Sequence, residues 1–299
     1  DVLLMSEDVP IAIDKIKEAI KSKKISQKEI DRRCKKILLA KKWMGLDSIK
    51  QIDCRNLVER INNSEVEFVN RKLIENSLTL LQNYDKLLPL DYLDTLKIAS
   101  VSIGENSEYF TSMLSNYASI RHFTIDKNPD SKSRKDMLDQ LAEYNLVIAS
   151  VHQSNENPWK KHKIERNTDL FLQTLSVQSK VIVTLFSNPY SINDFLFTNN
   201  FDGFILAYQN SRTAQELAAQ SIFGGIRLSG RLPVSTHHYK LNLGLQTKGV
   251  RMKYTIAEEA EVNEELLLKI DSLAENAIKE KATPGCQIVI AKEGKVFFQ

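Results

Sequence analysis

Short, continuous apolar runs alternate with segments of helical periodicity between residues 97 and 223. The runs predict strands at residues 97–103, 120–125, 146–151, 181–186 and 203–208. The other segments repeat apolar residues at helical spacing and predict helices at residues 107–117, 131–144, 165–177, 192–198 and 213–223. Apolar strands that alternate with helices are typical of a parallel sheet with helices on both faces. Right-handed crossovers then predict a doubly wound α/β fold of about five strands.

Further elements are predicted to flank this fold. Residues 2–5 are wholly apolar, as in a strand buried within a parallel sheet, and a helix is predicted from Pro10 onward. A capping box, Ser26 with Glu29 three residues later, starts a second helix. Residues 65–83 predict a long amphipathic helix. Near the other end, a helix at residues 263–281 and two short apolar runs around a Gly-containing turn predict a helix followed by a β-hairpin.

The two end segments lead us to expect an internal piece of a larger protein, without a complete catalytic site. The apolar strand at residues 2–5 has no neighbour before it, and an isolated hairpin is marginal in water. We therefore expect residues 1–45 and 260–299 to be protease-sensitive, aggregation-prone or docked on another chain.

Composition excludes several classes of function. The chain has 299 residues, 42% hydrophobic and 26% charged, which is ordinary for a globular protein of about two domains. The net charge is +3 and the Lys and Arg residues are scattered, so we expect no nucleic-acid partner. No apolar run reaches the ~18–20 residues that span a bilayer. The three cysteines, Cys34, Cys54 and Cys286, lack metal-ligand spacing, so we expect free thiols, no metal and no cofactor.

Polar residues follow each of the five predicted strands, where doubly wound sheets bind their ligands. They are Gly104-Glu105, Asp126, His152-Gln153, Asn188-Pro189-Tyr190 and Gln209-Asn210. The candidate binding residues among them are Glu105, Asp126, His152, Asn188, Tyr190 and Gln209. They could converge on a small polar ligand such as a sugar, or they could be polar because the chain enters solvent there.

No motif assigns a catalytic residue. The sequence has no GxGxxG or P-loop pattern after a strand, no Gly-x-Ser-x-Gly and no Ser-x-x-Lys. His237 and His238 lie in a polar stretch without a companion ligand, which predicts solvated loop histidines. Glu7 and Asp8 follow the predicted strand at residues 2–5, so they could bind substrate, or they could cap the next helix.

Several segments together resemble glycoside hydrolase family 3. Residues 1–8 (DVLLMSED) and 32–42 (RRCKKILLAKK) are similar to the end of its catalytic (β/α)8 barrel and the helix pair that follows. Residues 76–83 (NSLTLLQN) and 88–90 (LPL) resemble the entry to its α/β sandwich domain. Residues 224–234, from the Gly pair to GRLPV, resemble the exit from that domain. The branch that these segments resemble is the β-N-acetylglucosaminidase type.

The C-terminal part resembles a different family. Its helix and the segment TPGCQIVIAKEGKV at residues 283–296 are similar to the opening of a serine β-lactamase-like domain, a module that bacterial proteins fuse to this glycosidase. Together the resemblances imply the end of a barrel at residues 1–45, a linker at 46–64, an α/β sandwich domain at 65–235, a linker at 236–260 and the start of a β-lactamase-like domain at 261–299.

The resemblance implies an enzyme whose catalytic groups lie outside this chain. The family's nucleophilic Asp and its acid/base loop precede the last barrel strand, and neither motif is present, so this chain alone is expected to be inactive. The implied parent is a bacterial hydrolase that cleaves β-linked N-acetylglucosamine from amino-sugar or cell-wall oligosaccharides. Its partner within the protein would be the rest of the barrel, and a periplasmic or secreted location is implied.

Three alternatives remain open at this point. The chain could be a non-enzymatic scaffolding or carbohydrate-binding α/β module. It could also be the serine-hydrolase part of a fusion protein. A nucleotide- or flavin-binding function rests on the predicted fold alone, because no phosphate-binding loop follows a strand.

Overall fold

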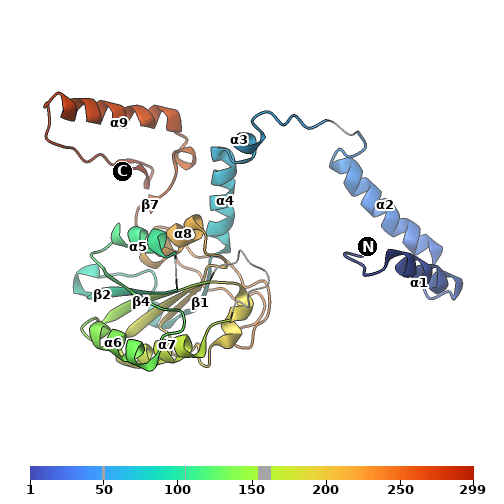
Figure 1. Ribbon diagram of the computed structural model, residues 1–299, viewed down its shortest axis with the longest axis horizontal. Helices are drawn as coiled ribbons and strands as arrows, with labels where there is room; N and C mark the ends of the chain where they lie inside the picture. The colour runs from blue at the N-terminus through green and yellow to red at the C-terminus, as the bar shows by residue number, and fades with distance from the viewer. Residues whose placement is uncertain (49–50, 105, 154–162) are drawn as a thin grey trace. The chain divides into compact units, whose positions relative to one another are not determined.

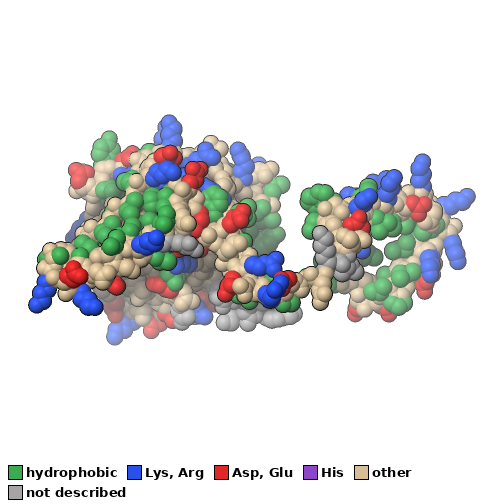
Figure 2. All heavy atoms as spheres, turned by 90° about the horizontal axis from the view of Figure 1, so that it is seen from above, with side chains coloured by type: hydrophobic (Ala, Val, Ile, Leu, Met, Phe, Trp, Pro, Cys, Tyr) green, Lys and Arg blue, Asp and Glu red, His purple; other side chains and the backbone are tan. Residues whose placement is uncertain are grey.

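The computed structural model describes residues 1–48, 51–104, 106–153 and 163–299, and in it the chain forms two units, Asp1–Ile61 and Asn62–Gln299. The described part of the first unit contains helices α1 (Val9–Lys21), α2 (Gln27–Trp43) and α3 (Leu57–Ile61). Ser26 starts α2 as the capping box predicts, because its hydroxyl accepts a hydrogen bond from the Glu29 N–H at 3.2 Å. Neither α1 nor α2 has a buried residue, and Figure 2 shows apolar side chains of this unit on the surface among Lys and Arg.

A six-stranded sheet forms the centre of the second unit. Its strand order is β1-β6-β5-β4-β2-β3, and every neighbouring pair is parallel except β1 with β6. The strands are β1 (Thr79–Asn83), β2 (Ile98–Ile103), β3 (Arg121–Ile125), β4 (Leu146–His152), β5 (Lys180–Phe186) and β6 (Gly203–Leu206). All five strands predicted between residues 97 and 208 are present, so the predicted doubly wound α/β fold is confirmed, with one additional strand.

Helices cover both faces of this sheet, as Figure 1 shows. The helices are α4 (Ser64–Ser77), α5 (Glu108–Ser115), α6 (Ser131–Leu141), α7 (Arg166–Gln178) and α8 (Arg212–Phe223). Helices α6 and α7 cover one face, where Phe171 and Leu185 belong to one apolar cluster. Helices α4, α5 and α8 cover the other, where Phe186 and Leu217 belong to a second cluster. Full burial of each such side chain stabilises the fold by ~1.5–3 kcal/mol.

The central strands are buried along almost their whole length. Every residue of β2 and β4 is buried, and in β5 only Lys180 is exposed. Three small hydroxyl residues, Ser102, Ser150 and Thr184, lie in register across these strands and are fully buried. Because side chains alternate along a strand, they share the sheet face that α5 and α8 cover.

After α8 the chain returns along the β1 edge of the sheet. The Gly230 N–H donates to the Leu78 carbonyl at 3.1 Å, and the Leu245 N–H donates to the Leu80 carbonyl at 2.8 Å. Residues 228–245 therefore cover β1, whose outer backbone groups would otherwise lack strand partners. At the opposite edge, β3 pairs with β2 alone within the described part of the chain.

The C-terminal part adds a small second sheet with the strand order β7-β9-β8. Its elements are β7 (Lys253–Tyr254), the 3₁₀ turn η4 (Ala257–Ala260), α9 (Glu264–Lys279), β8 (Ile290–Lys292) and β9 (Lys295–Phe298). The predicted helix and hairpin are thus both present. We expected the hairpin to lack a strand partner within the chain. Instead, β9 pairs with β7 of the same chain.

The predicted helix at residues 65–83 is too long. Helix α4 ends at Ser77, and the apolar residues after it form β1, which pairs antiparallel with β6. The leucines at positions 78, 80 and 81 fit either a helix or a strand by their spacing, and pairing with β6 decides between them.

Two other predicted elements differ. The helix predicted at residues 192–198 is instead the 3₁₀ turn η3 (Pro189–Asp194), which begins earlier because Asn188 caps it. Residues 2–5, predicted as a strand, are irregular and highly exposed, because a strand forms only with a hydrogen-bonded neighbour. Short 3₁₀ turns also occur at η1 (Tyr84–Lys86) and η2 (Leu93–Thr95). In the described regions, every helix falls short of the length or apolar character that crossing a membrane requires.

Residues 228–245 approach β1 closely, so we predict that replacing Gly230 by a residue with a side chain destabilises the fold. A Cβ atom at this position would lie 2.5 Å from the Leu78 carbonyl oxygen and closer still to that of Ser77, and neither backbone oxygen can move independently of the edge strand. We expect Gly230→Ala to lower the free energy of unfolding by about 3 kcal/mol, measured by urea denaturation.

Gly249→Ala is the matched control, because its Cβ would meet only the Gly224 carbonyl at an ordinary 3.8 Å. We expect it to unfold at nearly the wild-type urea concentration. Equal stability of the two variants would show that residues 228–245 do not bind tightly along β1.

Candidate functional site

The predicted binding residues lie at the carboxyl edge of the parallel strands. Asp126 follows β3, His152 ends β4, Asn188 and Tyr190 follow β5, and Gln209 follows β6. The sixth candidate, Glu105, falls outside the described residues. The sheet order places the ends of β6, β5, β4, β2 and β3 side by side, so this edge is the natural place to look for a ligand site.

His152 lies at the centre of a buried hydrogen-bond network at this edge. The residue is only 4% exposed. Its Nδ1 lies 2.8 Å from Asn210 Oδ1, and its Nε2 lies 2.9 Å from the Ser150 hydroxyl. Gln215 on α8 extends the network, because its amide nitrogen donates to Asn210 Oδ1 at 2.8 Å and to the Asn106 carbonyl at 2.6 Å. The network therefore joins β4 to the starts of α5 and α8.

These contacts determine the protonation of His152. Because Asn210 Oδ1 is an acceptor that also receives the Gln215 amide, Nδ1 of His152 carries the proton. Burial lowers the pKa of His152 from 6.5 to about 4, while the hydrogen bond to Asn210 opposes this change. The imidazole is consequently neutral at neutral pH.

Aromatic rings pack directly against His152. The imidazole stacks on Phe186 with a centroid distance of 4.6 Å, and the edge of Phe110 lies at 6.1 Å. A general acid or base must come within hydrogen-bond reach of the substrate proton that it transfers. The burial of His152 and the pairing of both its nitrogens suit a residue that holds β4 to α8, rather than one that transfers protons.

The other described candidates make local contacts. The Asp126 carboxylate accepts the Asn128 N–H at 2.8 Å, and Asn188 Oδ1 accepts the Tyr190 N–H at 2.9 Å. Tyr190 is exposed, and Gln209 is half-buried. Among the described residues, no side-chain hydrogen bond joins candidates from different strand ends. The described part also contains no group of three His, Cys, Asp or Glu side chains that could hold a metal ion.

Glu7 and Asp8, the other predicted binding residues, lie in the first unit. The Asp8 carboxylate accepts the Ile11 N–H at 2.9 Å and is the N-cap of α1. This contact accounts for Asp8 by helix capping, the second of the two interpretations that the sequence left open. Glu7 is exposed.

The sequence interpretation did not single out Gln215, which links three segments of the network. The feature that points to Gln215 is its polar side chain on α8, a helix that is buried from Thr213 to Phe223. A buried amide needs hydrogen-bond partners, so its position one turn after the Ser211 N-cap points to the loop ends beside it. Ser150 carries the equivalent signal within the apolar strand β4.

A second histidine forms a serine–histidine arrangement on the edge strand β3. His122 Nδ1 lies 2.6 Å from the Ser100 hydroxyl, and its Nε2 lies 2.8 Å from the hydroxyl of Ser115. Burial lowers the pKa of His122. Ser115, however, ends α5, where the helix presents carbonyl groups that disfavour the oxyanion of an acyl-transfer reaction. The arrangement is therefore unsuited to nucleophilic catalysis.

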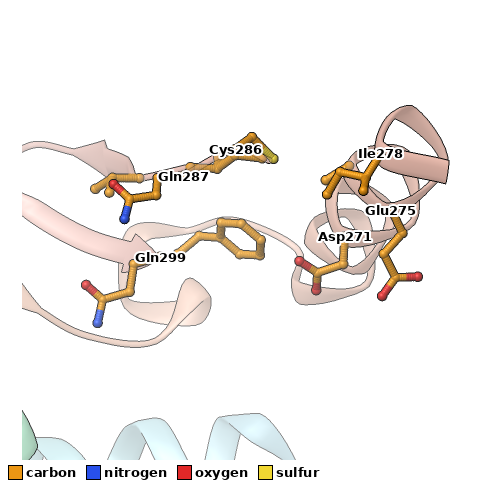
Figure 3. Close-up of a pocket in the computed structure, with 10 residues that line it drawn as sticks. Asp271, Glu275, Ile278, Cys286, Gln287 and Gln299 are labelled. Carbon is orange, nitrogen blue, oxygen red and sulfur yellow. The ribbon is translucent and has the colours of Figure 1, made fainter. Parts of the chain in front are cut away.

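One pocket lies away from the carboxyl edge, between α9 and the segment that leads into β8. Its volume is about 640 Å³, and Figure 3 shows Cys286 and Ile278 facing each other across it. Asp271 and Glu275 of α9 contribute carboxylates to its wall. The pocket thus combines an exposed thiol, two acids and apolar side chains, without a histidine that could activate the thiol.

Among known proteins, this chain resembles solved structures only. No protein-family model matches the sequence, and no curated protein matches it. A glycoside hydrolase family 3 β-N-acetylglucosaminidase from Paenibacillus sp. str. FPU-7 is 19% identical with a TM-score of 0.47, over 74% of this chain and 42% of that one.

Two further solved structures are also glycosidases, a β-glucosidase and a second family 3 β-N-acetylglucosaminidase. A β-glucosidase from Listeria innocua in complex with isofagomine is 17% identical with a TM-score of 0.48, over 73% of this chain and 34% of that one. A fungal multi-domain β-N-acetylglucosaminidase is 18% identical with a TM-score of 0.48, over 77% of this chain and 26% of that one. This chain therefore spans less than half the length of the solved structures that it resembles.

The buried neutral His152 predicts a pH dependence of stability. Its folded-state pKa of about 4 lies below the ordinary 6.5, so the unfolded chain binds its proton first as the pH falls. The folded state consequently loses stability between pH 6.5 and pH 4, by about 3 kcal/mol from this group. We expect His152→Gln to remove this part of the pH dependence, measured by urea denaturation at several pH values.

His237→Gln serves as the control, because His237 is exposed on a loop. It should retain the wild-type dependence on pH. The interpretation fails if the His152 variant loses as much stability as the wild type between pH 6.5 and pH 4.

Proposed function

We propose that residues 65–235 form the non-catalytic second domain of a glycoside hydrolase that cleaves β-linked N-acetylglucosamine residues. Residues 1–45 would be the end of its catalytic barrel, and residues 261–299 the start of a β-lactamase-like domain. The observation that carries the proposal is a set of contacts. The segments that resemble the entry and exit of the family's α/β domain lie in contact; they are residues 76–83 with 88–90, and residues 224–234.

Two contacts join these segments directly, and a third lies next to them. The Gly230 N–H donates to the Leu78 carbonyl at 3.1 Å, and the Leu90 N–H donates to the carbonyl of Ile222 at 2.9 Å, just before the exit. Gly224 lies so close to Pro89 that a Cβ atom would be 2.9 Å from the proline Cβ. The entry and exit are over 100 residues apart in sequence, yet they form one joint. Resemblances that arose by chance would not be expected to lie in contact.

The carboxyl edge supports a non-catalytic role for this domain. Retaining and inverting glycosidases use a pair of carboxyl groups on either side of the scissile bond. Asp126 is the only carboxylate among the described candidates at this edge, and its side chain is engaged with its own turn. His152, which could replace a carboxylic acid as proton donor, is buried and neutral.

Two non-catalytic roles are possible for such a domain, scaffolding and carbohydrate binding. Sugar binding needs accessible polar groups, often beside an exposed aromatic ring. His152 is the central polar residue of the edge, and both its nitrogens are hydrogen-bonded to internal partners while its ring stacks on the buried Phe186. Tyr190 at the same edge is exposed, but the neighbouring Asn188 and Asp126 side chains are engaged with their own turns. We therefore favour scaffolding, in which the domain supports the barrel without a ligand of its own.

We expect residues 1–299 alone to show no hydrolysis of 4-nitrophenyl N-acetyl-β-D-glucosaminide, while the full-length parent protein hydrolyses it. The reason is that a glycosidase needs both of its carboxyl groups, which this chain does not provide by motif. The release of 4-nitrophenolate measures both proteins, with the matching β-D-glucoside as the control for the acetamido group.

Hydrolysis by residues 1–299 alone would contradict the non-catalytic assignment. A parent protein that hydrolyses only the glucoside would contradict the proposed substrate. Titration of residues 1–299 with N,N′-diacetylchitobiose in a calorimeter distinguishes the two roles, because heat of binding would favour carbohydrate binding over scaffolding.

Within the first unit we propose that Glu7 orients the substrate, since Asp8 is already committed to capping α1. We expect Glu7→Gln in the full-length protein to lower kcat/KM for the N-acetylglucosaminide about tenfold or more, because the variant loses a charge-assisted hydrogen bond. Steady-state kinetics measure kcat/KM of the wild type and the variant. Circular dichroism confirms that both proteins are folded to the same extent.

Glu18→Gln is the matched control on α1, where Glu18 is exposed and pairs only with Lys15 at 3.0 Å among its described neighbours. It should leave kcat/KM unchanged. An equal loss of activity in both variants would mean that the substitutions act through the helix and not on the substrate.

A further inference from the structure

The C-terminal part of the chain is attached to the α/β domain through a buried cluster of charges. Glu259 on the turn η4 is its centre, with a side chain that is 3% exposed. The carboxylate pairs with Lys72 of α4 at 2.6 Å and with Lys253 of β7 at 2.8 Å, and it accepts the Thr255 hydroxyl. Glu75 of α4 pairs with Lys253 at 2.5 Å, so α4 contributes both a cation and an anion.

The terminal hairpin joins the same cluster from the other side. Lys295 of β9 donates to the Glu259 carbonyl at 3.0 Å, and its ammonium lies 4.0 Å from the Glu259 carboxylate. Lys292 at the end of β8 donates to the Ala260 carbonyl at 2.9 Å. The turn η4 is therefore bound by lysines from three places in the chain, namely α4, β7 and the hairpin.

Strand pairing alone provides little support for the hairpin. Strand β7 has two residues, and its link to the hairpin consists of the Lys253 N–H to the Gly294 carbonyl at 2.9 Å and the Thr255 N–H to the Val296 carbonyl at 2.8 Å. Val296 is the buried residue of β9, whereas its neighbours are half-buried. Short strands with one buried side chain are marginal without further contacts.

We propose that the carboxylate of Glu259 is a clasp that fixes the terminal hairpin to α4, and that loss of its charge frees the hairpin while the six-stranded domain stays folded. Removing one member of a buried charge cluster leaves its partners desolvated with less opposite charge, which is costly. Lys253 is the partner most affected, since its side chain is only 10% exposed and its ammonium would then share Glu75 with Lys72. The residues of the two apolar clusters around the large sheet take no part in the clasp, so the cost is local.

The clasp makes α4 a shared support. The same helix packs against α8 of the large sheet and, through Lys72 and Glu75, holds the segment that carries the hairpin. This inference is independent of the proposed glycosidase function, because it concerns how two parts of the chain are coupled.

Native-state hydrogen exchange followed by NMR tests the clasp in the whole chain. The amides of Lys253 and Thr255 report on the link, because each donates to the hairpin. The amide of Ala207, which donates to the Leu185 carbonyl inside the large sheet, reports on global unfolding. We expect Glu259→Gln to accelerate exchange at Lys253 and Thr255 about tenfold or more, with Ala207 unchanged.

Glu258→Gln is the matched control, because Glu258 is a neighbouring carboxylate in the same turn that, within the described part of the chain, forms no ion pair with Lys72, Lys253 or Lys295. In this variant the reporter amides should exchange at the wild-type rate. Should Glu259→Gln fail to fold, Lys295→Met tests the clasp from the hairpin side, with the same acceleration expected at both reporter amides. Unchanged exchange at Lys253 and Thr255, or an equal acceleration at Ala207, would overturn the proposal.

Discussion

Burial of β4 and β5 on both faces is the constraint on which the rest of the α/β domain depends. A strand in this position must be apolar along its length, and it needs a helical layer on each side. Both conditions are met by α6 and α7 on one face and by α4, α5 and α8 on the other. The polar groups of these strands are therefore confined to small hydroxyls within the sheet and to the carboxyl edge where the strands end.

The same constraint determines how the buried polar groups are satisfied. His152 is paired with Ser150 and with Asn210 in the loop after β6, and Ser150 is also paired with Ser102, so their desolvation is offset by hydrogen bonds. Thr184 in the same register has no partner for its hydroxyl among the described residues, which costs ~1–3 kcal/mol. The ion pair of Arg71 with Glu216, at 2.7 Å between α4 and α8, is buried as well.

The elements that could be predicted from the sequence are those in which local pattern and tertiary context agree. The five parallel strands are continuous apolar runs with turn residues on both sides, and all five are present. The strand β1 was missed because Leu78–Leu81 continue the apolar spacing of α4, and only the distant partner β6 distinguishes strand from helix. Residues 2–5 show the reverse case, in which a strand-like composition without a neighbour gives no strand.

The candidate site could be predicted only in part. Parallel topology places Asp126, His152, Asn188 and Gln209 at one edge, and the sequence identifies that edge correctly. Side-chain direction and depth decide which of them meet, and neither follows from order along the chain. His152 points inward because its strand is the central one, whereas Asp126 follows the edge strand and remains exposed.

The position of β1 beside residues 228–245 has a consequence for how such a protein can evolve. Both connections of the α/β domain leave from the same edge of its sheet, held together by the approach of Gly230 to Leu78. A body with adjacent connections can be spliced into a host protein without pulling apart the segments before and after it. The domain is portable in this sense, and one recombination event could add it to another chain or remove it.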